Sequence, residues 1–241
     1  MSDDVAREPI LRVEGLSAGY AGQHVVHDID LNVVEGEAIT VIGSNGAGKS
    51  TLFKAIVGML PGARGSVAFD GADISRWATH RITRRGLAYV AAERHLFPHM
   101  TVTENLALGA FPGRPEARRD ELVFDLFPRL AERRRQNAGT MSGGEQQMLA
   151  VGRALMSNPK VLMLDEPTTG LAPRLAVDAY RALARLRDAG LTLIVAEQQV
   201  PLALELAGRG YVLENGRIGL SGTCEDLERN PDVQRAYLGV A

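Results

Sequence analysis

The chain has 241 residues, 45% of them hydrophobic, and its 27 lysine and arginine side chains nearly balance 29 aspartates and glutamates, for a formal net charge of −2. This balance argues against a protein that is held on nucleic acid by bulk phosphate attraction. The single cysteine, Cys224, excludes an internal disulfide and indicates a reducing compartment. The longest stretch without Asp, Glu, Lys or Arg, residues 15–27, is too short to span a membrane and the acidic start lacks the parts of a signal peptide, so we expect a cytoplasmic protein.

The first third of the chain predicts a β-rich region. Alternating apolar and polar residues predict half-exposed strands at 10–13 and 24–34, and a β-branched run predicts a buried strand at 37–42. A helix follows at 50–60, where Pro61 and Gly62 stop it, and then a strand at 65–69. We expect the early strands to form an antiparallel region beside the main sheet.

A glycine-rich loop joins the predicted strand 37–42 to the predicted helix 50–60. It matches the pattern G-x-x-x-x-G-K-[ST], in which backbone N–H groups and the helix N-terminus surround phosphate groups. The lysine of such a loop reaches the β- and γ-phosphates, and the next hydroxyl, here Ser50, can bind Mg²⁺. An ordinary glycine-rich turn with a solvated lysine is the alternative, which the strand and helix on either side disfavour. The predicted phosphate-binding residues are Gly43, Ser44, Asn45, Gly46, Ala47, Gly48, Lys49, Ser50 and Thr51.

Strands and helices alternate in the rest of the chain. Buried strands are predicted at 86–91, 161–164 and 191–196, and helices at 145–156 and 175–189. This alternation predicts an α/β fold with a mainly parallel core sheet and right-handed crossovers. The segment between the strand at 86–91 and Ser142 is too long for a plain loop, and it carries helical patterns at 103–108 and 118–135. We therefore predict one domain, 1–241, with a helical subdomain inserted at about 92–157.

Two further patterns carry polar groups at the ends of predicted elements. Ser142-Gly143-Gly144-Glu145 opens the helix that contains 145–156; it forms an S-x-x-E capping box, yet paired glycines are costly in a helix and suggest close approach of a ligand. The apolar strand 161–164 ends in Asp165 and Glu166, at the edge where open α/β sheets bind ligands. Asp165 would hold Mg²⁺ through water and Glu166 would polarise an attacking water, whereas an acidic helix cap before Pro167 is the plainer alternative.

The chain resembles the nucleotide-binding subunits of ABC transporters, because three motifs occur in the order of that family. They are the phosphate loop, the Ser-Gly-Gly-Glu-Gln run at 142–146 and the Leu-Asp-Glu-Pro run at 164–167. The resemblance covers essentially the whole chain and implies a P-loop NTPase fold of the ABC ATPase type. In that family two subunits sandwich two ATP molecules, and each phosphate loop faces the partner's signature. The resemblance thus implies ATP and Mg²⁺ as ligands, with Ser142, Gly143, Gly144 and Glu145 at ATP and Ser142 and Gly144 contributed across the interface.

One branch of the family is more similar than the others. The runs at 144–150, 170–173, 196–198, 210–216 and 236–239 are similar to the second ATPase subunit (Liv F type) of branched-chain amino acid importers. This implies that ATP hydrolysis drives uptake of branched-chain or related hydrophobic amino acids. The implied direct partners are a second ATPase subunit, in a homodimer or heterodimer, and membrane permeases. The permeases would hold the chain peripherally on the inner face of the membrane. An extracytoplasmic solute-binding protein is an indirect partner, and nucleic acid is not a partner.

The same resemblance implies roles for single residues. Tyr20, the aromatic before the phosphate loop, would stack on adenine, although a surface strand aromatic is the alternative. Gln198 stands where many relatives have a switch histidine, as this branch commonly does; it can donate a hydrogen bond to the γ-phosphate but carries no charge. Residues 97–100 lie where the coupling helix of a permease docks, and packing within the helical subdomain is the alternative. Glu166, Gln198 and Glu93 are the predicted catalytic residues.

One position departs from the family pattern. Ala92 stands where a Gln or Glu would contact Mg²⁺ and the attacking water, and Glu93 follows one place later. Either Glu93 fills the role through a shifted backbone or the contact is missing. Import of urea or short amides by the same machinery, a soluble non-transport ABC ATPase, and a nucleotide-binding regulator with little turnover remain alternatives.

Overall fold

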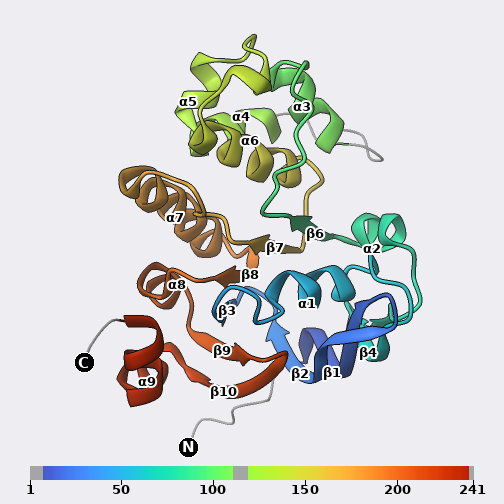
Figure 1. Cartoon of the computed structure of the whole chain (residues 1–241). Coiled ribbons are helices and arrows are strands. Elements are labelled where there is room, and N and C mark those ends of the chain that lie inside the picture. Colours follow the sequence, from blue (N-terminus) through green and yellow to red (C-terminus); the bar gives the residue numbers. More distant parts are fainter. Residues whose placement is uncertain (1–7, 111–118, 239–241) are drawn as a thin grey trace, which may run out of the picture.

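A computed structural model describes residues 8–110 and 119–238 of the chain (Figure 1). The acidic start at 1–4, the first residue of the predicted helix 118–135 and Gly239 lie outside these ranges. Within them, no helix is both long enough and apolar enough to cross a bilayer.

The N-terminal half begins with an antiparallel sheet. Its order is β2-β1-β4-β5, built from β1 (Pro9–Tyr20), β2 (Gln23–Val34), β4 (Arg64–Phe69) and β5 (Ala72–Asp73). A two-residue turn joins β1 to β2, and both Ala21 and Gly22 have positive φ, at 50° and 82°. This backbone matches the twist of a tight hairpin. The first strand therefore reaches this turn at Tyr20, well past its predicted end at residue 13.

Among the described residues, the second sheet has six strands in the order β10-β9-β3-β8-β7-β6. The strands β3 (Ala38–Ile42), β6 (Leu87–Val90), β7 (Val161–Asp165), β8 (Thr192–Glu197) and β9 (Arg209–Glu214) are parallel, and β10 (Arg217–Thr223) pairs antiparallel with β9 at one edge. The predicted α/β fold, with its mainly parallel core sheet and N-terminal antiparallel region, is therefore confirmed.

Both faces of the parallel sheet are covered. Along β7, Val161 and Met163 pack into a core shared with the antiparallel sheet and with α1 (Lys49–Ile56), which lies between the two sheets. Leu162 and Leu164 point to the other face and pack against helices. Because successive strand residues point to opposite faces, a strand buried on both sides must be apolar throughout, which explains the continuous hydrophobic runs in the sequence.

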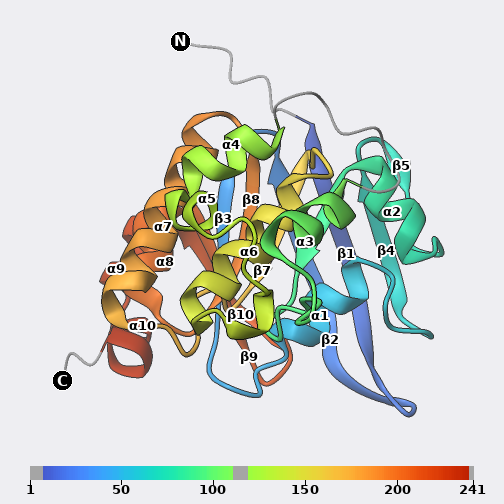
Figure 2. The ribbon, with the colours of Figure 1, turned by 90° about the horizontal axis from the view of Figure 1, so that it is seen from above.

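A group of helices stands over the second face, as the two views show (Figures 1 and 2). It contains α3 (Val102–Gly109), α4 (Arg119–Leu126), α5 (Pro128–Glu132) and α6 (Gly143–Leu155), with a 3₁₀ turn at Ala138–Thr140. Its core is continuous with that face of the sheet and with α7 (Pro173–Asp188). The insertion of a helical group between β6 and β7 fits the predicted subdomain, whose limits at 92 and 157 stay a prediction.

The remaining helices complete the outline. They are α2 (Thr79–Arg85), before β6, and α8 (Val200–Leu206), α9 (Cys224–Arg229), α10 (Pro231–Val233) and a π-helical turn at Gln234–Leu238 near the C-terminus. The apolar residues of α8 and α9 pack with Ile42 and Val212 at the end of the sheet that carries β9.

Two predicted helices are wrong in their extent, and two strands are not predicted from the alternation pattern. The predicted helix 50–60 ends at Ile56, because Gly58 adopts positive φ (71°) and closes the helix end. The predicted helix 118–135 divides into α4 and α5, because Pro128 keeps Phe127 out of the helical region. The strands that the pattern misses are β9 and β10, although the run at 210–216 is among those that resemble the family.

Candidate active site

The phosphate loop has the strand–loop–helix setting that its pattern requires. It leaves β3 at Ile42, and Gly48 is the N-cap of α1, with φ of 109° and no side chain capping the helix. A Cβ added at Gly48 would lie 2.8 Å from Cγ1 of Val26, so the hairpin β1–β2 leaves no room for a side chain there. An uncapped helix N-terminus of this kind leaves backbone N–H groups free for an anion.

Lys49 joins the loop to the acidic strand end. The residue is only 4% exposed, and its Nζ donates hydrogen bonds to the carbonyl oxygens of Gly43 (2.7 Å) and Ser44 (3.1 Å). The same Nζ lies 3.1 Å from Oε1 of Glu166. The fold therefore brings the two predicted motifs, more than a hundred residues apart in the chain, into direct contact.

Asp165 is a buried carboxylate with a free oxygen. The residue is 1% exposed, and its Oδ2 accepts a hydrogen bond from the Tyr89 hydroxyl at 3.0 Å. The Ser50 hydroxyl lies near enough to lower the pKa of Asp165, but Oδ1 has no hydrogen-bond partner of good geometry. The net pKa of Asp165 is raised, first by burial and then by the charge of Glu166, against the effects of Ser50, Tyr89 and Lys49. A buried acid with one unused oxygen beside a hydroxyl suits a cation.

Glu166 follows in a strained backbone conformation. Its φ is 46°, which glycine adopts freely and a side-chain-bearing residue rarely does. The backbone N–H of Glu166 donates to the carbonyl of Ala196 at 2.8 Å, and its Oε2 accepts from the Thr169 hydroxyl at 3.1 Å. The carboxylate is thereby held between Lys49 and the loop that follows β7.

The end of β8 carries two polar residues with different surroundings. Gln198 is exposed, and its backbone N–H donates to Oε2 of Glu197 at 3.1 Å. Glu197 itself is completely buried. Gln198 thus lies next to the strand end that carries Glu166, since Asp165 pairs with Ala196 across the two parallel strands.

The signature segment is a complete helix cap. The Ser142 hydroxyl accepts from the backbone N–H of Glu145, and Oε2 of Glu145 accepts from the Ser142 backbone N–H at 2.9 Å. Arg133 of the neighbouring loop lies 2.8 Å from the Glu145 carboxylate. A Cβ on Gly144 would come within 2.6 Å of Cδ1 of Leu175, so a larger residue there would require the Leu175 side chain to shift. Gly143 has more room, because only the end of Arg94 lies near it.

The signature and the phosphate loop are not joined within this chain. Among the described residues, no hydrogen bond or ion pair links 142–145 to 43–51, and α6 lies in the helical group away from α1 (Figure 1). The predicted ATP-binding residues therefore form two separate groups.

Two of the predicted residues stand at the margin of the site. Tyr20, at the end of β1, is 48% exposed. The Glu93 side chain is 59% exposed, and its Oε1 lies 3.9 Å from Nζ of Lys54. The pKa of Tyr89 is raised mainly by burial and by the charge of Asp165, and the charge of Glu93 contributes as well. Glu93 is thus within electrostatic reach of the hydroxyl that binds Asp165.

The structure adds residues that the sequence analysis did not single out. Arg94 donates to the Gln147 side chain at 3.0 Å and to the Thr169 carbonyl at 3.4 Å, so it connects α6 with the loop after Glu166. Arg94 also has positive φ (63°), a feature that no residue pattern announces. Tyr89 could have been suspected only as a polar tip at the end of a buried strand.

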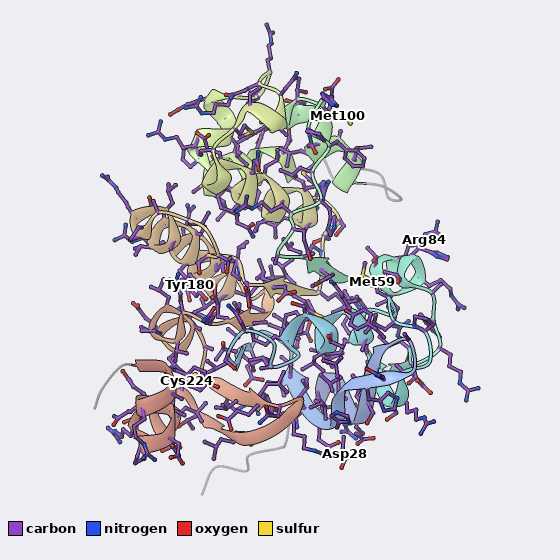
Figure 3. The ribbon with its side chains drawn as sticks, in the orientation of Figure 1. Asp28, Met59, Arg84, Met100, Tyr180 and Cys224 are labelled. Atoms are coloured by element: carbon purple, nitrogen blue, oxygen red, sulfur yellow. The ribbon has the colours of Figure 1, made fainter. Side chains whose placement is uncertain are left out.

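An apolar groove of about 710 Å³ opens beside the helical group. Met59, Phe97 and Leu108, all exposed, line it together with Arg94 and Arg153. Met59 lies near α2 (Figure 3). Of the residues 97–100, Phe97 lines the groove, whereas the other three are not among its lining residues.

The chain is similar to known proteins over nearly its whole length. Residues 26–169 match the family model described as ABC transporter. The high-affinity branched-chain amino acid transport ATP-binding protein BraG of Pseudomonas aeruginosa is 45% identical, over 95% of this chain and 100% of that protein. The probable branched-chain amino acid transport ATP-binding protein LivF of Archaeoglobus fulgidus is 37% identical, over 96% and 99%. Among solved structures, a nucleotide-free ATP-binding cassette from an ABC transporter superimposes with a TM-score of 0.82 at 29% identity, covering 97% of this chain and 100% of that one.

Proposed function

The chain belongs to the ABC transporter family, and from this premise we propose that it is the ATP-binding and ATP-hydrolysing subunit of an importer that takes up branched-chain amino acids through separate membrane permeases. The observation that carries the proposal is the end-to-end match with a branched-chain amino acid transport ATP-binding protein, over a fold in which Lys49 and Glu166 meet at the phosphate loop.

The loop 43–51 would bind the phosphates of ATP. Its glycines and the uncapped start of α1 supply backbone N–H groups, and Lys49 supplies the positive charge. In the structure this charge is balanced by Glu166 and two carbonyl oxygens. Incoming phosphates would compete for Lys49 and release the Glu166 carboxylate, which makes that carboxylate available to a water molecule.

Ser50 and Asp165 would hold the Mg²⁺ that accompanies ATP. The unpartnered Oδ1 of Asp165 is the feature of this structure that fits a cation, because a buried carboxylate oxygen without a partner is costly. When bound, the ion would neutralise charge on the β- and γ-phosphates. The Tyr89 hydroxyl keeps the other oxygen of Asp165 in place.

Glu166 would act as the base that orients and polarises the attacking water, and Gln198 would donate a hydrogen bond to the γ-phosphate. Both residues sit at the ends of adjacent parallel strands, which supports a shared task. Glu93 would take over the role of the Gln that Ala92 replaces. Its side chain would leave the weak contact with Lys54 and turn toward Tyr89.

The signature residues Ser142, Gly143, Gly144 and Glu145 would meet the ATP of a second ATPase subunit. Their separation from the phosphate loop of the same chain supports this arrangement, since one chain alone does not bring the two groups together. Tyr20, half exposed at the end of β1, is free to stack on an adenine ring.

The apolar groove would receive a helix of the permease. Exposed Met59, Phe97 and Leu108 give it the apolar surface that a helix-in-groove contact uses. Docking there would hold the chain peripherally at the inner face of the membrane and connect ATP-driven closure to the permease, while a solute-binding protein outside delivers the cargo.

The decisive experiment is copurification of the full chain with its permeases, followed by ATPase assays in the presence of candidate cargoes. We expect leucine, isoleucine and valine, delivered by the binding protein, to stimulate hydrolysis, and the Lys49→Ala variant to lose it. Stimulation by urea or short amides would move the proposal to that cargo. Hydrolysis without any copurifying permease would overturn the transport role and leave the ATPase.

A further inference from the structure

Glu197 is a completely buried residue next to the site, and its carboxylate has no role in the proposed binding of phosphate or Mg²⁺. Its Oε1 accepts two hydrogen bonds from Thr168, one from the backbone N–H at 3.2 Å and one from the hydroxyl at 2.7 Å. Its Oε2 accepts the backbone N–H groups of Gln198 at 3.1 Å and Gln199 at 3.3 Å. Each oxygen therefore serves a different loop.

The two loops are the ones that carry the proposed water-activating and γ-phosphate-binding residues. Thr168, itself fully buried, lies two places after Glu166, and Gln198 follows Glu197 directly. The backbone N–H of Glu166 also donates to the Ala196 carbonyl, so the two strand ends are already in register beneath the carboxylate. A displacement of either loop would have to break contacts to one shared side chain.

All four groups that meet the Glu197 carboxylate are donors, so an acceptor-only side chain matches them. Burial raises the pKa of Glu197, and the hydrogen bonds from Thr168, Gln199 and Gln198 oppose that rise. Tyr180 of α7 lies near the same carboxylate, between α7 and α8 (Figure 3), but its hydroxyl makes no hydrogen bond of good geometry. A glutamine at 197 would turn an N–H₂ group toward one pair of donors and leave that loop without its acceptor.

We infer that Glu197 is a positioning residue that fixes the loop after Glu166 and the backbone of Gln198 as one unit, so that both side chains approach ATP together. This inference rests on the proposed ATPase function. It assigns Glu197 no contact with ATP and no proton transfer; the carboxylate acts through the geometry of Glu166 and Gln198.

The test compares three variants of the full chain, Glu197→Gln, Thr168→Val and the double variant, with two control variants. Thr192→Val is the structural control, because Thr192 is equally buried and accepts the Gly36 N–H at 2.9 Å at the opposite end of β8. Glu205→Gln, on the exposed side of α8, controls for the change in charge. For each, kcat, KM and the dissociation constant of a fluorescent ATP analogue are measured, together with a thermal melt.

We expect Glu197→Gln to lower kcat roughly ten- to hundredfold, as loss of alignment does, with the ATP dissociation constant changed by less than about threefold. Thr168→Val should lower kcat less, because it removes the hydroxyl hydrogen bond and keeps the backbone one. The double variant should fall no further than Glu197→Gln, because both changes break the same connection. Thr192→Val and Glu205→Gln should keep the kcat of the folded protein.

Three results would overturn the inference: a folded Glu197→Gln protein with unchanged kcat, effects of the two single variants that multiply in the double variant, or a loss of kcat that Thr192→Val reproduces. If Glu197→Gln does not fold, Thr168→Val decides, and an unchanged kcat there counts against the inference. Failure of the unmodified chain to hydrolyse ATP is a different result, because it contradicts the proposed function itself.

Discussion

Two helix starts contribute the proposed phosphate-facing groups of this protein, and they are built in opposite ways. The start of α1 has no side-chain cap and no acidic residue in its first turn, and its lysine is buried against carbonyl oxygens and Glu166. The start of α6 is capped by Ser142 and Glu145, and Arg133 adds an ion pair with Glu145. The start of α1 has no side-chain cap, whereas the start of α6 is capped by side chains of its own chain.

This difference separates stability from function. The cap at α6 would exist in any stable helix with this sequence, so its residues cannot be assigned to ATP from geometry alone. The start of α1 cannot be explained by stability, because an uncapped helix end and a buried lysine both cost free energy. A residue at the first site should affect hydrolysis directly, and one at the second should affect helix stability and hydrolysis separately.

The largest expected effect comes from breaking the Lys49–Glu166 pair. Glu166→Gln should lower kcat by about 10²- to 10⁴-fold, as loss of a general base does, while ATP binding is kept or tightened because Lys49 is freed. An ATP-bound dimer should accumulate, which size-exclusion chromatography with ATP would detect. Glu205→Gln serves as the control, and unchanged turnover in Glu166→Gln would remove Glu166 from the water-activating role.

The next prediction separates capping from phosphate recognition at α6. Asp and Asn both cap helices, so Ser142→Asp and Ser142→Asn differ mainly in charge. We expect Ser142→Asp to hydrolyse ATP about tenfold more slowly than Ser142→Asn, since a negative charge would face the partner's phosphates. A thermal melt of both variants measures the separate repulsion from Glu145, whose Oε2 lies 2.9 Å from the Ser142 hydroxyl. Equal rates in ATPase assays would mean that Ser142 only caps the helix.

Replacement of the buried Asp165 by Asn should have opposite effects on stability and on activity. Because its pKa is raised in the folded protein, the folded state holds the proton to higher pH than the unfolded chain. Its contribution to stability therefore falls as pH rises from 3.8 through the raised pKa, and the charged form is costly at neutral pH. Without ATP and Mg²⁺, Asp165→Asn should raise the free energy of unfolding by about 1 kcal/mol at pH 7 and flatten this pH dependence.

Urea unfolding at a series of pH values measures this effect, and ATPase assays with Mg²⁺ should show loss of activity in the same variant. Asp178→Asn is a suitable control, because Asp178 is an exposed partner of Arg181 and should change stability by less than about 0.5 kcal/mol. A destabilised Asp165→Asn protein would contradict the idea that the free oxygen awaits a cation.

The smallest expected effect concerns Ala92 and Glu93. If Glu93 replaces the absent Gln, Glu93→Ala should lower kcat several-fold and Ala92→Gln should leave it unchanged. Lys54→Ala is the matched control, because it frees the Glu93 carboxylate without removing it. An increase of ATPase activity in Ala92→Gln, with no loss in Glu93→Ala, would show instead that the contact is missing in this protein.

The residue pattern was a good guide wherever the chemistry is local. The loop 43–50 between β3 and α1, the strand ending in Asp165 and the cap at Ser142 depend on neighbouring residues, so spacing alone locates them. The errors fall where single residues override a pattern. Gly58 shortens α1 and Pro128 divides the predicted helix 118–135, because backbone conformation at one residue decides each case.

By itself the sequence determined the family, the α/β class and the places of the two motifs that we propose face phosphate, because these follow from runs of adjacent residues. Only the tertiary structure decided that Lys49 meets Glu166, that Asp165 keeps one oxygen free, and that Glu197 serves two loops at once. These contacts join strands that are distant in the chain, and no periodicity records them. They form because parallel strands end side by side at one edge of the sheet, where carboxylates, a lysine and backbone N–H groups must satisfy one another away from water.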